Sequence, residues 1–213
     1  MNTDDLVSLL AAGVEAIDAK RTARRYWLAT TGGLLGALTL TAGILRLNPA
    51  LSREVFEPMF WIRETYCAVL GFLGLVAVTR LARPGVRLGL VPPAIAVAVI
   101  AMWILAVMVL LAAPPQMRPH LFLGGTAAIC PFLIALVAAP LLIAFLWVLR
   151  DLAPTRLRLA GAAAGFAAGS FGALAYSLHC PELAAPFIGV WYLLGVLIPT
   201  AIGASLGPRL MRW

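Results

Sequence analysis

Six long apolar runs, separated by short segments that carry most of the charges, dominate this sequence of 213 residues. A helix needs about 20 apolar residues to cross a bilayer, so each run is long enough to form one transmembrane helix. The chain is 62% hydrophobic and 12% charged, whereas soluble domains are about 45–50% apolar and about 25% charged. We therefore expect an all-α polytopic membrane protein, without room for a separate soluble enzyme domain. The expected spans are residues 27–45, 62–79, 90–112, 126–149, 159–178 and 187–206.

The fourth span is the least regular of the six. The apolar stretch 121–149 is longer than one bilayer crossing and contains Pro131 and Pro140. A proline inside a helix removes a backbone hydrogen bond and bends or ends the helix. We therefore expect the first few residues of this stretch to lie at the membrane interface.

Most basic residues fall on one side of the predicted spans. Basic loop residues resist translocation, so the side with more of them faces the cytoplasm. Placing both termini in the cytoplasm leaves only Arg46, Arg53, Arg63 and Arg118 of the 16 basic residues on the outer side. The cytoplasmic ones are then Lys20, Arg21, Arg24, Arg25, Arg80, Arg83, Arg87, Arg150, Arg156, Arg158, Arg209 and Arg212.

Glycines recur at four-residue spacing in three of the spans. Small residues at this spacing share one helix face, where they let two backbones approach closely in lipid. We expect these faces to pack inside the bundle, and a homodimer contact is the alternative. The glycines are Gly32 and Gly36; Gly161, Gly165 and Gly169; and Gly203 and Gly207.

The spans contain little that resembles transport or catalytic machinery. Pumps and transporters need ionisable groups at mid-membrane depth, and the charges here lie in loops or near span ends, with Arg63 and Glu64 at the start of the second span. His120 and His179 both fall at the outer face. No paired carboxylates or nucleophile with a base is visible, so we expect no enzyme, no cofactor and no metal site. A small transporter or channel lined by hydroxyls and carbonyls, or a structural membrane subunit, remains as an alternative function.

The three cysteines all map toward the outer side. Two such thiols can form a disulfide if their α-carbons come within about 7 Å. We expect Cys67 to be a packing residue, since cysteine behaves as a small apolar side chain when buried. Both roles stay open for Cys130 and Cys180, because Cys180 lies in a polar loop. His179 and Glu182 beside it are too few for a convincing metal site.

Residues 1–26 form the one substantial soluble element, and residues 27–213 form the transmembrane domain. Asp4 and Asp5 suit the first turn of a helix, where the helix dipole favours negative charge. An apolar stripe follows at three- and four-residue spacing, opposite Ser8, Glu15 and Asp18. We expect an amphipathic cytoplasmic helix that docks into the groove of a partner protein, with a structural cap on the bundle or the membrane surface as alternatives. The stripe consists of Leu6, Leu9, Leu10, Val14 and Ile17.

Several segments together resemble the NrsF family of six-span bacterial inner-membrane proteins, which act as anti-sigma factors. The likeness extends over nearly the whole chain. It rests on Met1–Leu6, the pair Arg24 and Arg25, Leu81–Gly85, His179–Glu182, and the stretch from Trp191 through Pro199 and Gly207 to Trp213.

This resemblance implies a function and a partner. Proteins of this kind hold an extracytoplasmic-function sigma factor inactive at the membrane and release it under stress such as heavy-metal or oxidative exposure. It implies that the tail, residues 1–25, binds the sigma factor and that Cys130 and Cys180 are the sensing pair, while Cys67 lies outside the pattern. Whether the inner loops 80–87 and 150–158 also contact the partner stays open. We expect no direct contact with nucleic acid.

Overall fold

The computed structural model describes residues 19–83, 85–152 and 154–211. Every regular element in this part of the chain is helical, and six segments are long and apolar enough to cross a membrane. The expected fold class is thereby confirmed, whereas the expected tail helix lies outside the described residues up to residue 18. The elements are α2 (Ala19–Leu40), η1 (Thr41–Leu45), α3 (Leu51–Glu54), α4 (Pro58–Leu81), α5 (Val91–Ala112), α6 (Arg118–Leu123), α7 (Cys130–Arg150), α8 (Leu157–Tyr176), α9 (Ala185–Phe187), η2 (Ile188–Tyr192) and α10 (Leu193–Leu210).

The fourth span begins at Cys130, four residues later than expected. Pro131 lies in the first turn of α7, where the missing N–H of proline costs no helical hydrogen bond. The preceding residues form the short helix α6 and a turn instead of continuing the span. The start of this apolar stretch is therefore separate from the span, while its location at the membrane interface stays a prediction, and Pro140 lies inside α7.

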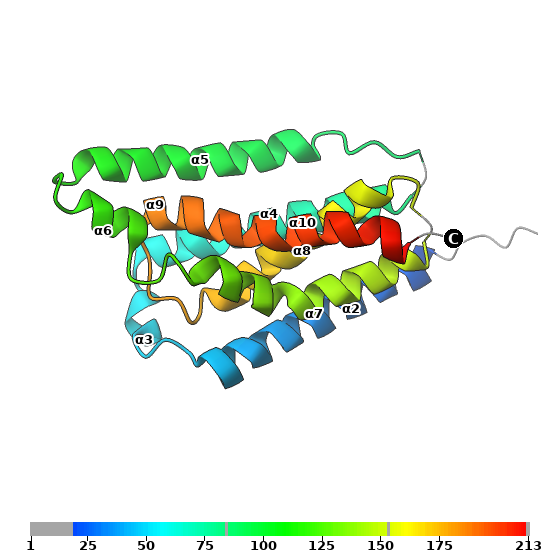
Figure 1. Cartoon of the computed structure of the whole chain (residues 1–213), viewed down its shortest axis with the longest axis horizontal. Helices are drawn as coiled ribbons and strands as arrows, with labels where there is room; N and C mark the ends of the chain where they lie inside the picture. The colour runs from blue at the N-terminus through cyan, green and yellow to red at the C-terminus, as the bar shows by residue number, and fades with distance from the viewer. Residues whose placement is uncertain (1–18, 84, 153, 212–213) are drawn as a thin grey trace, which may run out of the picture.

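The central helix of the bundle is α8. It makes its most extensive contacts with α10, and it also packs against α4 and α7. Figure 1 shows α2 and α5 at opposite edges of the bundle, with the other spans between them. Burial agrees with these positions, since 72% of the span residues are buried in the central helix α8 and 11% in α5 at the edge.

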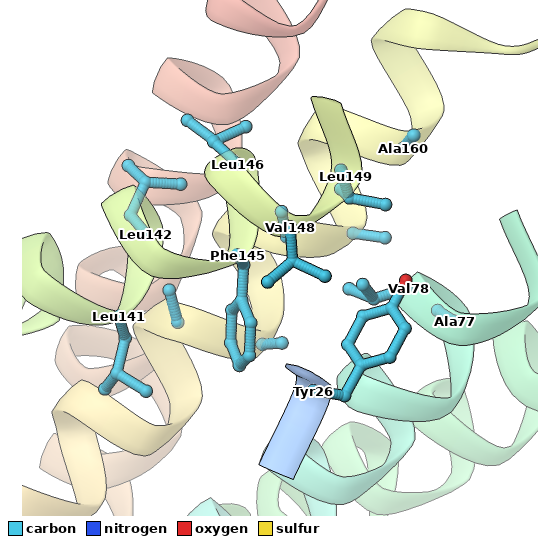
Figure 2. Packing of buried hydrophobic residues seen from close by; sticks show 14 of the residues in the cluster. Tyr26, Ala77, Val78, Leu141, Leu142, Phe145, Leu146, Val148, Leu149 and Ala160 are labelled. Atoms are coloured by element: carbon cyan, nitrogen blue, oxygen red, sulfur yellow. The ribbon is translucent and has the colours of Figure 1, made fainter. Parts of the chain in front are cut away.

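The bundle has two chemically different ends. The arginine end (right in Figure 1) holds the start of α8 and the ends of α4, α7 and α10, and the cysteine end (left) holds α3, α6 and α9. A cluster of buried apolar side chains fills the arginine end. In Figure 2, Tyr26 of α2, Val78 of α4 and Phe145 of α7 point toward one another within it.

Glycines set the contact between α8 and α10. A β-carbon on Gly161 would collide with the carbonyl group of Gly203, and one on Gly165 with the carbonyl group of Pro199. Helices in lipid associate by such close backbone packing, because the surrounding lipid is as apolar as the helices themselves. The expected packing role is confirmed for these glycines and for Gly36, which lies against Pro140, but it is wrong for Gly32, which faces open space.

We predict that Gly161→Ala destabilises the folded bundle, because the added methyl group must push α8 away from α10. The expected loss is about 1–3 kcal/mol, as for other overpacked interiors. The matched control is Gly32→Ala, which adds the same methyl group to open space and should leave stability unchanged or raise it by up to about 1 kcal/mol. Unfolding of the purified proteins in detergent micelles, followed by circular dichroism, measures both. Equal stability of the two variants would contradict the α8–α10 contact.

Candidate functional site

The connecting segment, residues 177–184 between α8 and α9, lies at the cysteine end and carries Cys180. Cys130 is the first residue of α7, and its N–H bonds the carbonyl oxygen of Thr126 at 2.9 Å. The structure brings the two side chains into the same buried cluster, where Cys130 is the neighbour with the largest influence on the Cys180 thiol. Both are free thiols with no exposed surface. The two cysteines singled out in the sequence therefore form one buried pair.

The surroundings of Cys180 favour its thiolate form. The hydrogen bond from Cys130 is the largest influence and lowers the pKa of the Cys180 thiol to about 6, although burial acts in the opposite direction. The backbone of Glu182 and the charge of Arg63 lower it further. Since a free cysteine has a pKa of about 8.5, Cys180 is mostly a thiolate at neutral pH.

Arg63 joins the connecting segment to α4. Its guanidinium is fully buried, and Nη1 donates to the carbonyl oxygens of Cys180 at 3.1 Å and Glu182 at 3.2 Å. Its Nε donates to Glu64 at 3.2 Å, and Glu64 accepts a second hydrogen bond from the hydroxyl of Ser177 at 3.0 Å. These contacts tie α4 to the connecting segment at two places, one of them Ser177, the residue that caps the C-terminal end of α8.

Arg63 lies near the outer end of its span, as expected, and the structure adds that its side chain is fully buried. The helix α4 begins at Pro58, so Arg63 lies in its second turn, inside the bundle. A buried charge persists only where it is paired and hydrogen-bonded, and Glu64 with the two carbonyl groups meets that condition. The sequence did carry a signal, because Arg63 and Glu64 are adjacent opposite charges at the start of an apolar run.

Three further hydrogen bonds fix the connecting segment. His179 Nδ1 faces the carbonyl oxygen of Arg46 at 2.8 Å, and the Glu182 carboxylate accepts from the N–H of Gly125 at 2.7 Å. The N–H of Asn48 bonds the carbonyl oxygen of Leu178 at 3.0 Å. His179 is therefore a half-buried anchor to the chain before α3 rather than a solvated loop residue. The sequence pattern gave no indication of these partners.

Cys67 lies one helical turn after Arg63 in α4 and is buried in the apolar cluster that also contains the thiol pair. Its burial among apolar neighbours fits the expected packing role. Within the described part of the chain, no group of three or more His, Cys, Asp or Glu side chains is placed to hold a metal ion.

The hollows of the described structure are apolar. One of about 450 Å³ lies between α4 and α5 and is lined by residues such as Trp61, Tyr66 and Met102. Ser170 is the buried polar residue in the middle of α8, and its hydroxyl already bonds the carbonyl oxygen of Phe166 at 2.8 Å. The transporter alternative needs a polar path, and these features do not supply one.

The remaining predicted site residues, Asp4, Asp5 and the apolar stripe of the tail, lie outside the described residues.

Comparison with known proteins gives a consistent family assignment. The family described as NrsF, negative regulator of sigma F, matches residues 10–213. The chain is 46% identical over 213 residues to the probable anti-sigma-F factor NrsF of Azospira oryzae. It is 37% identical over 216 residues to the anti-sigma-F factor NrsF of Caulobacter vibrioides, and both comparisons cover the full length of both chains. No solved structure matches the chain.

We predict that Cys180 titrates with a midpoint near pH 6, measured by the ultraviolet absorbance of its thiolate after subtraction of a Cys180→Ser spectrum. The pKa of Cys180 is lower in the folded protein than in the unfolded chain, where it is about 8.5. Ionisation of Cys180 therefore stabilises the fold fully above about pH 8.5, and this stabilisation is lost as the pH falls through the pKa of the folded protein. Cys130→Ala should raise the midpoint because it removes the main hydrogen bond. Cys130→Ser keeps a hydrogen-bond donor and should shift the midpoint less than Cys130→Ala does. Equal midpoints for the wild type, Cys130→Ala and Cys130→Ser would show that Cys130 does not act on Cys180.

Proposed function

The chain belongs to the NrsF family of negative regulators of sigma F, which confirms the resemblance seen in its sequence motifs; it is thus an anti-sigma factor, and we propose that it sequesters an extracytoplasmic-function sigma factor through its N-terminal tail. We further propose that a stress signal sensed by Cys130 and Cys180 releases the sigma factor. The observation that carries this proposal is the full burial of both cysteines in one apolar cluster at the cysteine end, as free thiols.

We propose a place for the protein in the bacterial inner membrane, with both termini in the cytoplasm. The distribution of basic residues supports this orientation, because the arginine end carries most of them. The exposed arginines of the described part at that end are Arg24, Arg25, Arg83, Arg87, Arg150, Arg156, Arg158 and Arg209. The cysteine end then faces the periplasm, an oxidising compartment in which two thiols can form a disulfide.

The tail is the segment best suited to bind the sigma factor. The connections at the arginine end are short, spanning residues 82–90 between α4 and α5 and residues 151–156 between α7 and α8. The tail carries an apolar stripe of helical period, which fits the groove of a partner protein. The exposed arginines of the two connections are available for additional contacts.

Deletion of residues 2–20 should raise sigma-dependent transcription to the level of a strain without the protein, because the sigma factor loses its docking element. A reporter gene under a sigma-dependent promoter measures this. A finer test compares Leu10→Asp, which charges the apolar stripe, with Ser8→Asp, which places the same charge on the opposite face. Derepression is expected for Leu10→Asp alone. Continued repression by the deletion variant would rule out the tail as the binding element.

The thiol pair is placed where a small chemical change can alter the bundle. A two-electron oxidant from the periplasm would take two electrons from the pair, the thiol of Cys130 would lose its proton, and the S–S bond formed with the Cys180 thiolate would bring the sulfurs to about 2.05 Å. The connecting segment that carries Cys180 is hydrogen-bonded to α4 and continues directly from α8. Since α8 contacts four other spans, α2, α4, α7 and α10, its displacement offers a route from the cysteine end to the arginine end. Thiol capture by a soft metal ion would act on the same two atoms.

Replacement of both Cys130 and Cys180 by serine should abolish induction by the stressor, because no thiol chemistry is then possible at this site. Basal repression should persist or shift in level. The matched control is Cys67→Ser, which removes a buried thiol outside the pair and should leave induction intact. The same reporter gene, measured with and without oxidant or heavy metal, gives the result. Normal induction of the double variant would eliminate the sensing role.

A further inference from the structure

Arg63 is a buried cation with spare hydrogen-bonding capacity. A guanidinium has five N–H donors, and those of Nε and Nη1 are directed to Glu64, Cys180 and Glu182. Its Nη2 has no hydrogen-bond partner in the described structure, although it is buried. Leaving a charged donor buried and unpartnered is costly. The surroundings of Arg63 should therefore contain a negative charge in addition to Glu64.

The contacts of Arg63 place it beside Cys180. Its Nη1 bridges the carbonyl oxygens of Cys180 and Glu182, so the guanidinium is held against the backbone on both sides of Pro181. The electrostatic influence of Arg63 reaches the sulfur of Cys180. This arrangement explains why a cation is retained in an otherwise apolar cluster.

The charged and titratable groups near Arg63 and the Cys180 sulfur come from α4, α7, α8, η2 and the connecting segment. Arg63 is the positively charged member of this set. The others are Cys67 and Glu64 of α4, Cys130 of α7, Tyr176 at the end of α8, Tyr192 of η2 and Glu182 of the connecting segment itself.

We propose that Arg63 is a positioning residue and counter-ion of the thiol pair: its Nη1 holds the connecting segment by the carbonyl groups of Cys180 and Glu182, and its buried guanidinium places a positive charge beside the sulfur of Cys180. This inference rests on the proposed function, since it assigns a regulator to the proposed sensing pair. Any chemistry that consumes the negative charge of the sulfur leaves Arg63 with Glu64 as its anionic partner. A change at the sulfur is thereby passed to α4 as well as to α8.

The test is a pH titration of Cys180 by thiolate absorbance in the full-length protein, in detergent micelles. Arg63→Gln removes the charge and should raise the midpoint by about 1–3 pH units; a rise of two units lowers the thiolate fraction at pH 7 about tenfold. Arg63→Lys keeps the positive charge but lacks the planar guanidinium that reaches both carbonyl groups. The midpoint of Cys180 in this variant should therefore lie between those of the wild type and Arg63→Gln. Arg53→Gln, a charge change at an exposed site of the same end, should leave the midpoint unchanged.

Glu64→Gln keeps the shape of the side chain and removes the competing negative charge, so it should lower the midpoint. Opposite shifts in the Arg63→Gln and Glu64→Gln variants support the proposal, because a general loosening of the fold would move both in the same direction. If Arg63→Gln does not fold, Glu64→Gln still decides: a rise or no change overturns the inference. Equal shifts for Arg63→Lys and Arg63→Gln also overturn it. The titration needs no signal or sigma factor, so a failure of the sensing proposal is recognised separately, by induction in the double cysteine variant.

Discussion

Close contact between the backbones of α8 and α10 is the interaction on which the bundle depends. Apolar side chains gain little by leaving lipid for one another, so helices in a bilayer must be held by fine packing and polar contacts. Gly161, Gly165 and Gly203 permit an approach that a single methyl group would block. Because α8 also packs against α4 and α7, this contact fixes the position of the helix that leads directly into Cys180.

The polar contacts of the cysteine end complement this apolar packing. Arg63, Glu64 and Ser177 connect α4, α8 and the connecting segment through hydrogen bonds that have little competition from water. Buried polar groups are stable only when their partners are in place, so the segment has a narrow range of permitted positions. A thiol pair anchored in this way is sensitive to a small displacement of either sulfur.

The sequence predicted the six spans because hydrophobicity over about 20 residues is a strong signal that depends on no tertiary contact. It could not predict which faces meet. Gly32 and Gly161 share the same spacing pattern, but only Gly161 lies against another backbone. Arg63 lies near a span end, as the sequence indicated, but its full burial depends on tertiary contacts that a single sequence does not display. The contact between Cys130 and Cys180 joins segments 50 positions apart, and the residues alone left their pairing open.

The two ends of the bundle are suited to different tasks for a physical reason. A sensor needs a group whose charge or bonding changes with its surroundings, and a low-pKa thiolate beside another thiol is such a group. In the proposed function the other end retains the partner, for which the exposed arginines supply charge and the apolar stripe of the tail sequence supplies apolar area. Packed helices move as rigid bodies between discrete arrangements rather than deforming gradually. The helix α8 contacts four other spans, and one of its ends continues into the connecting segment, so it can couple the two ends of the bundle.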